Sequence, residues 1–250
     1  MKTLLKFKLD ELDVIYNQHR PMADIYDMAI QLAIIDYVKP NTVWELGAAS
    51  GNWSIIMHKL MDNTNARFTL VENFREDEQY KSIGVPQNEQ ELRQRMKQFD
   101  FSPDLVIESV DNLPLSDEKV DVIRLDCDFD YNSDPSNLSK WILNNSSDRL
   151  VIFVDDIRMN KRPDRLFMMQ EMVNRGLLEF LWGGHDEAAW CKPFGLNRQD
   201  LIDNIKEIYL PYYENLNRMT HLWFYDTQID YITSRPRWIK DGNPIDSSTF

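Results

Sequence analysis

The sequence predicts an α/β fold in three layers, with a seven-stranded, mostly parallel sheet that ends in an antiparallel hairpin. Two observations carry this prediction. Short apolar runs alternate with segments of helical periodicity, a pattern typical of repeated strand–helix–strand units. Late in the chain, two apolar runs are separated only by a short loop that contains Gly183 and Gly184, which favours an antiparallel pair.

The first half of the chain supplies helices and strands in alternation. Apolar residues over Ile25–Val38 are too dense for one amphipathic face, so we expect this helix to be covered on more than one side. Small and turn-forming residues separate the segments that follow. These are a strand at Thr42–Leu46, a helix at Asn52–Met61, a strand at Phe68–Val71, and a long connection over Asn73–Pro103 that includes a helix at Gln90–Phe99.

The second half contains three further parallel strands and two well-punctuated helices. Asp134 is a plausible N-cap and Pro135 occupies the first position of one helix, while Gly176 ends the other. An aromatic tail follows the last helix. The expected elements are strands at Leu105–Ile107, Val120–Leu125 and Leu150–Val154, helices at Pro135–Ile142 and Pro163–Arg175, the hairpin strands Leu177–Trp182 and Ala188–Cys191, and a helix at Asn197–Tyr209.

Length, charge and cysteine content limit the classes to which this protein could belong. The chain has 250 residues, enough for one domain or two, and we expect a main domain over 1–195 with a helical and aromatic extension over 196–250. A net charge of −13 disfavours a nucleic acid or a membrane surface as partner, and two cysteines exclude a disulfide scaffold. Without a predicted targeting segment or membrane span, we expect a cytoplasmic protein. The aromatic tail could pack against the main domain, form the surface of a homo-oligomer, or cover the substrate pocket.

Glycine is scarce, with eight residues in the chain, so glycines in a pattern are informative. Two of them, Gly47 and Gly51, fall in a small-residue loop between the first strand and the helix that follows it. Ligands of open α/β sheets bind beyond the carboxyl ends of the strands, where such loops let the backbone approach closely. The second strand then ends in Glu72, whose carboxylate could accept both hydroxyls of a ribose. A tight turn beside a solvent-facing glutamate is the alternative.

The loop resembles the first motif of class I S-adenosylmethionine-dependent methyltransferases, which have a Rossmann-like fold. Glu72 matches their ribose-binding acid, and Ser109 or Asp111 could take the place of the acid that contacts adenine after the third strand. The resemblance covers roughly residues 25–192. It implies S-adenosylmethionine as cofactor, held by Glu45, Gly47, Ala48, Ala49, Gly51, Trp53, Glu72, Asn73, Ser109, Asp111 and Asp126.

Carboxylates gather after the fourth and fifth strands, at Asp126, Asp128, Asp130, Asp155 and Asp156. Carboxylates packed together repel one another unless a cation or a proton intervenes, and hard oxygen ligands favour Mg²⁺ or Ca²⁺. Three interpretations stay open: a metal site, a solvated acidic rim, and direct contact with substrate.

The acidic cluster is similar to that of cation-dependent O-methyltransferases, which have an aspartate-rich stretch with a tyrosine after the fourth strand. This resemblance implies Mg²⁺ held by Asp126, Asp155 and Asp156, and catalytic roles for Asp126, Asp128 and Tyr131. It predicts methylation of an oxygen on a small-molecule acceptor. A non-catalytic protein that binds S-adenosylmethionine, or a scaffold of the same fold, is the main alternative.

Two other classes fit less well. A dinucleotide dehydrogenase also needs an acid about 20 residues after its glycine-rich loop, but this loop lacks the G-x-G-x-x-G spacing. Ribose 2′-O-methyltransferases of RNA have a similar first motif and a lysine after the fifth strand, where this chain has Asp155 and Asp156.

Among the histidines, His58 is expected to be structural and His185 to lie in an exposed hairpin loop.

Overall fold

A computed structural model describes most of the first 201 residues and three short strands beyond them. The described ranges are 11–12, 14–16, 25–61, 65–74, 78–116, 118–127, 135–156, 163–183, 187–193, 195–197 and 199–201, with the strands at 223–224, 239–240 and 243–244. Among these residues, no helix has both the length and the apolar character needed to cross a membrane.

The molecule is built around one sheet with the strand order β3-β2-β1-β4-β5-β7-β6-β8. The pairs among β1 to β5 are parallel, while β7 is antiparallel to both β5 and β6. The predicted sheet and terminal hairpin are therefore confirmed. The strands are β1 Thr42–Leu46, β2 Arg67–Glu72, β3 Asp104–Ile107, β4 Val120–Leu125, β5 Ser146–Val154, β6 Glu179–Gly183, β7 Ala188–Cys191 and β8 Trp223–Phe224.

The short strand β8 was not predicted. It pairs antiparallel with β6 through two residues of the aromatic tail, Trp223 beside Gly183 and Phe224 beside Trp182. Another two-residue pair, β9 (Ile239–Lys240) with β10 (Asn243–Pro244), forms a separate small sheet. Within the predicted helix Asn197–Tyr209, the structure describes Asn197 and a helical turn at 199–201. The other residues of that segment lie outside the described ranges.

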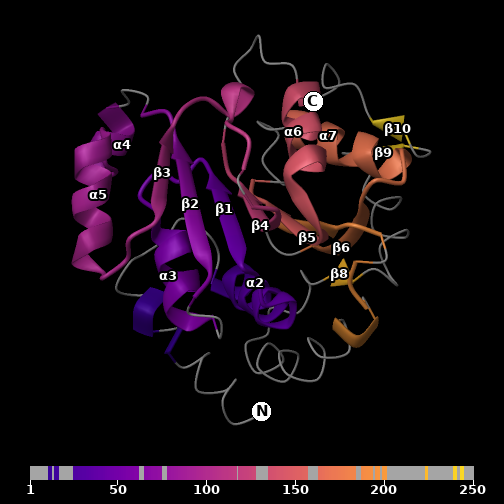
Figure 1. The fold of residues 1–250 in the computed structure, drawn as a ribbon, viewed down its shortest axis with the longest axis horizontal. Helices are drawn as coiled ribbons and strands as arrows, with labels where there is room; N and C mark the ends of the chain where they lie inside the picture. The colour runs from indigo at the N-terminus through magenta and orange to yellow at the C-terminus, as the bar shows by residue number, and fades with distance from the viewer. Residues whose placement is uncertain are drawn as a thin grey trace.

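Helices cover both faces of the sheet, which gives the three layers (Figure 1). α2 and α3 lie on one face with α5 toward the β3 edge, and α6 and α7 lie on the other. The helices are α2 Ile25–Val38, α3 Asn52–Leu60, α4 Glu78–Ser82, α5 Glu89–Gln98, α6 Pro135–Asn145 and α7 Pro163–Asn174. A short 3₁₀ helix, η1 (Val110–Asn112), follows β3.

Two apolar cores result, one on each face of the sheet. Alternate residues of a strand point to opposite faces, so Val43 joins the core under α2 and α3, while its neighbour Trp44 joins the core under α6 and α7. The helix α2 is buried nearly all round, as expected from its dense apolar pattern. Its buried residues include two polar ones: Asp27, which accepts from the amide of Glu187, and Gln31, which accepts from the indole of Trp53.

β5 starts four residues earlier than expected, at Ser146, immediately after α6. Asn145 makes this direct change from helix to strand possible, because its side chain donates to the carbonyl of Trp141 and accepts from the amide of Ser116. These bonds tie the end of α6 to the chain that precedes β4. The parallel register then places Leu46 beside Val71 and Leu125, so the ends of β1, β2 and β4 lie level at one edge.

Candidate active site

The loop after β1 lies at the point in the sheet where the strand order reverses. β2 and β3 lie on one side of β1, and β4 and β5 lie on the other. Gly47 has a φ of 87°, and a Cβ built on it would lie 2.4 Å from the backbone oxygen of Asp126. Its amide donates to the carbonyl of Val71, and the amide of Asp126 donates to the carbonyl of Leu46. Gly47 is thus required for the close packing of β1 against the end of β4, in addition to any approach of a ligand.

Glu72, at the end of β2, has a carboxylate whose position is determined by three backbone amides. One oxygen accepts from Ala49 at 2.6 Å, and the other accepts from Asn73 at 3.0 Å and from Phe74 at 3.1 Å. Ala49 and Phe74 have positive φ values of 47° and 43°, which non-glycine residues seldom adopt. Since a carboxylate accepts about four hydrogen bonds, the oxygen facing Ala49 keeps room for about one more.

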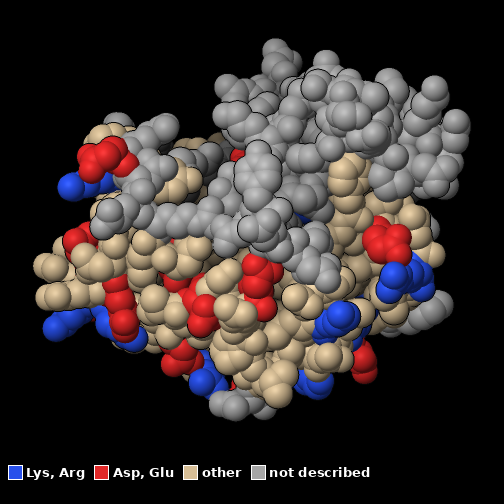
Figure 2. Space-filling view, turned by 90° about the horizontal axis from the view of Figure 1, so that it is seen from above, with Lys and Arg blue, Asp and Glu red and all other residues tan. Residues whose placement is uncertain are grey.

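A pocket opens in front of Glu72, with about 740 Å³ of space that includes open solvent. The segment between β2 and α5 supplies one wall, and the ends of β1, β3 and β4 supply the others. The lining residues are Gly47, Ala49, Val71, Glu72, Asn73, Phe74, Tyr80, Val85, Pro86, Gln87, Glu108, Ser109, Val110, Asp126 and Cys127. Figure 2 shows acidic side chains in the middle of the described surface, viewed from above the sheet of Figure 1.

The pocket brings together about half of the predicted cofactor residues. Gly47, Ala49, Glu72, Asn73, Ser109 and Asp126 all line it, whereas Glu45, Ala48, Gly51, Trp53 and Asp111 are not among its lining residues. The wall formed by Phe74, Tyr80, Val85, Pro86 and Gln87 was not predicted. No spacing within the long connection Asn73–Pro103 indicates which of its residues face the pocket.

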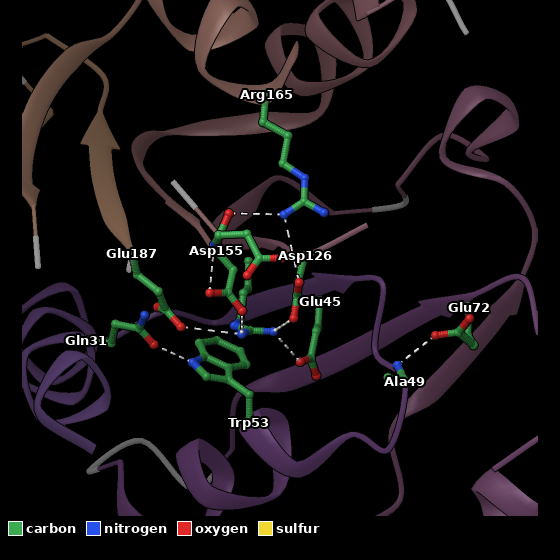
Figure 3. A network of polar contacts seen from close by, with 11 residues as sticks. Gln31, Glu45, Ala49, Trp53, Glu72, Asp126, Asp155, Arg165 and Glu187 are labelled. Atoms are coloured by element: carbon green, nitrogen blue, oxygen red, sulfur yellow. Dashed lines mark hydrogen bonds and ion pairs between the residues drawn. The ribbon is translucent and has the colours of Figure 1, made fainter. Parts of the chain in front are cut away.

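Arg124 of β4 is the centre of a buried charge cluster beside the pocket. Its four carboxylate partners, Glu45, Asp126, Asp155 and Glu187, are labelled in Figure 3. One guanidinium nitrogen lies 2.7 Å from Asp126 and 3.2 Å from Glu45, and the other lies 2.6 Å from Asp155 and 3.4 Å from Glu187. The side chain is only 5% exposed. This arginine was not predicted as a site residue, although a charge near the end of a largely apolar, buried strand is itself a signal, because buried arginines need partners.

Burial is the largest influence on the pKa values of the carboxyl groups in the cluster. It raises the pKa of Glu45 to about 7, although the Arg124 guanidinium acts in the opposite direction. Burial, and then the neighbouring charge of Asp155, raise the pKa values of Asp126 and Glu187 well above their ordinary range. Burial alone would lower the pKa of Arg124, but the four carboxylates outweigh it and raise that pKa. The arginine therefore stays charged.

The donor set does not fit the predicted Mg²⁺ site. Asp126 and Asp155 converge as expected, but one oxygen of each is paired with Arg124. The second oxygen of Asp126 lies 3.8 Å from Arg165 of α7, and the second oxygen of Asp155 accepts from the amide of Asp156. Within the described ranges, no group of three or more His, Cys, Asp or Glu side chains could hold a metal ion. Asp128 and Tyr131 lie outside these ranges.

Several residues named from the sequence have structural roles. Trp53 of α3 donates its indole N–H to Gln31 of α2, and its ring lies 5.6 Å from the Arg124 guanidinium. The Ser109 hydroxyl accepts from the amide of Asp111 and so caps η1. His58 packs against two phenylalanine rings, and burial lowers its pKa, as expected for a structural histidine. His185 lies outside the described residues.

The strand order and the antiparallel β7 define the Rossmann-like fold of class I methyltransferases. No family model and no curated protein sequence matches the chain. Solved structures do: a candidate caffeoyl-CoA O-methyltransferase from Staphylococcus aureus has a TM-score of 0.53 and 13% identity, over 74% of this chain and 92% of that one. The SAH-bound methyltransferase PaMTH1 from Podospora anserina has a TM-score of 0.51 and 13% identity, over 76% and 88%.

Proposed function

We propose that this chain is an S-adenosylmethionine-dependent methyltransferase that transfers the methyl group to an oxygen of a small-molecule acceptor. The observation that carries the proposal is the carboxylate of Glu72. Three backbone amides hold it beside the loop of Gly47, on the wall of a pocket at the carboxyl end of the sheet. This is the position at which α/β folds of this kind bind the ribose of an adenosine.

The chemistry of the pocket suits the proposed cofactor. S-adenosylmethionine combines a flat adenine, a ribose and a cationic sulfonium. Phe74, Tyr80, Val85 and Pro86 offer apolar and aromatic surface for the adenine, while Glu72 offers an acceptor for the ribose. Asp126 adds a carboxylate to the same wall, and a negative group there favours a cation.

Methyl transfer asks little covalent chemistry of the protein. The reacting oxygen must be held in line with the sulfonium methyl group, and its proton must leave as the new bond forms. Asp126 is the candidate proton acceptor, because burial and Asp155 raise its pKa and so increase its affinity for a proton. An oxygen acceptor is also supported by the likeness of the fold to a candidate O-methyltransferase. The net charge of −13 supports a small molecule over a nucleic acid.

Calorimetry with S-adenosylhomocysteine tests the first part of this proposal. The wild-type protein should bind it saturably with the ligand at up to about 1 mM, and a flat titration would refute the proposed function. Transfer of labelled methyl groups to a panel of phenols, catechols and hydroxylated acids tests the second part. Labelling of amines or nucleic acids in place of these hydroxyl compounds would contradict an oxygen acceptor.

A non-catalytic binding protein is the second candidate, favoured by the pairing of Asp126 with Arg124 at 2.7 Å. This pairing occupies one carboxylate oxygen of Asp126 with a donor, and that oxygen is then not free to accept a proton from an acceptor hydroxyl. The variant Asp126→Asn separates the two candidates. An enzyme should lose turnover and keep its affinity for S-adenosylhomocysteine, whereas a binding protein should have no turnover with any acceptor before the substitution.

A further inference from the structure

We propose that Arg124 takes the place that the sequence resemblance gives to a divalent cation, and positions the carboxylates of Asp126 and Asp155 beside the pocket without a bound metal. The inference rests on the proposed function, because it concerns the same pocket. It reverses the expectation that Asp126, Asp155 and Asp156 bind Mg²⁺.

Arg124 lies among four carboxylates and provides one positive charge that all four contact. Its two terminal nitrogens each face two carboxylates, one pair from Glu45 and Asp126 and the other from Asp155 and Glu187 (Figure 3). These four carboxylates come from β1, from the chain just after β4 and β5, and from the chain just before β7. A guanidinium presents several donors in one plane, so a single side chain can join carboxylates on both of its sides. A cation would instead require oxygens directed at one point.

A second guanidinium, that of Arg165 on α7, would also repel a cation bound at Asp126 and Asp155. Arg165 donates to the backbone carbonyl of Asp155 at 3.0 Å and lies 3.8 Å from Asp126. Any dication bound to Asp126 and Asp155 would therefore meet two positive charges within a buried, weakly screened region. The four oxygens of these two carboxylates also already face protein donors, from Arg124, Arg165 and the amide of Asp156.

Arg124 acts as a positioning residue, since it is absent from the lining of the pocket and Asp126 is part of it. The arginine is itself held firmly. It belongs to a buried strand between β1 and β5, and its guanidinium lies over Trp53, whose indole is bonded to Gln31 of α2. The orientation of Asp126 in the pocket is therefore transmitted from α2 and α3 through Arg124.

Titration of the wild-type protein with MgCl2 and CaCl2 tests the inference directly. We expect no saturable heat up to about 10 mM of either cation, a range that covers even weak protein sites. Affinity for S-adenosylhomocysteine should be the same with a chelator as with excess Mg²⁺. Saturable cation binding that Asp126→Asn abolishes would overturn the inference. Failure of S-adenosylhomocysteine to bind at all would refute the proposed function instead, and the cation titrations would still decide this question.

Substitution of the arginine provides the converse test. In Arg124→Met the carboxylates lose their counter-charge, so Ca²⁺ should now raise the melting temperature, whereas it leaves the wild type unchanged. Arg175→Met is the matched control, because Arg175 lies just after α7 and among the described residues its exposed side chain pairs only with Glu171. If Arg124→Met folds and Ca²⁺ does not change its melting temperature, the inference is contradicted. If that variant does not fold, the wild-type titrations stand alone as the test.

Kinetics separate positioning from mere stabilisation. Arg124→Lys keeps the charge, but an ammonium group is a compact point charge that cannot join both pairs of carboxylates. We expect kcat to fall while KM for S-adenosylmethionine stays within about twofold, because the cofactor wall at Glu72 is untouched. Equal loss in both parameters, or full activity, would count against a positioning role.

Discussion

The amide of Ala49 donates to the carboxylate of Glu72 over 2.6 Å, and this bond ties the loop after β1 to the end of β2. Two strands that are neighbours in the sheet thereby share one polar contact at the pocket wall. Both partners are held in place: Ala49 by a left-handed backbone conformation and Glu72 by two further amides. Strained residues that persist in such positions are often part of a functional site.

Replacing Glu72 by glutamine should weaken S-adenosylhomocysteine binding by about tenfold or more. The new amide NH₂ must face either Ala49 or the pair Asn73 and Phe74, all of which are donors, so the side chain can no longer hold its charged acceptor toward the pocket. Loss of one hydrogen bond to a charged group costs about 1.5–3 kcal/mol. Calorimetry of the variant gives the change in Kd. Glu78→Gln is the matched control, since that side chain is 94% exposed on α4. Equal affinities in the wild type and Glu72→Gln would remove Glu72 from the cofactor site.

Gly47→Ala should lower the free energy of unfolding by about 3 kcal/mol or more, through left-handed strain combined with overpacking. The added Cβ would lie 2.4 Å from the carbonyl oxygen of Asp126, which belongs to the backbone and cannot move aside easily. Gly84→Ala separates the two causes. Gly84 has a similar φ of 80° but open space around it, so its substitution should cost only about 1 kcal/mol. Urea denaturation measures both, and equal losses would show that the close approach at Gly47 does not matter.

The stability of the protein should fall as pH rises from about 4.5 to about 7, in part because of Glu45. Its pKa is about 7 in the folded protein and 4.5 ordinarily, so the folded state retains the proton longer. An acid of this kind contributes stability at low pH, and that contribution is lost as the pH rises through this window. Glu45→Gln should remove about 3 kcal/mol of this pH dependence, at 1.36 kcal/mol per unit of pKa.

Urea denaturation at several pH values between 4.5 and 7.5 measures this effect, with Glu171→Gln as an exposed control. The control should track the wild type across the whole range. Parallel pH profiles for the wild type and Glu45→Gln would mean that Glu45 titrates normally in the folded state.

Asn88→Ala should cost about 1 kcal/mol of stability by removing the cap of α5. The Asn88 side chain accepts from the amide of Glu91 and donates to the Glu91 carboxylate, which also accepts from the amide of Gln87 at the pocket wall. Urea denaturation of Asn88→Ala beside Gln90→Ala, an exposed position in the same turn, isolates the cap. A loss as large in Gln90→Ala would point to helix composition as the cause.

The same helix illustrates what could be read from the sequence. We expected α5 to begin at Gln90, and it begins at Glu89, after the cap Asn88. The error is small, because helical periodicity and turn residues are local properties of the chain. For the same reason α2 and β4 have the bounds that the sequence predicts. Glu72 and the loop of Gly47 were predicted together, since a strand end and the loop beside it recur at a regular spacing in this fold.

The sequence by itself determined the layered α/β fold, the order of its elements and the two segments that meet at Glu72. Only the tertiary structure decided what the acidic residues do. Arg124 reaches carboxylates at positions 45, 126, 155 and 187, and their distances depend on strand order and register rather than on separation along the chain. Charge interactions depend on distance and burial, so carboxylates that suggest a metal site in the sequence prove to surround an arginine.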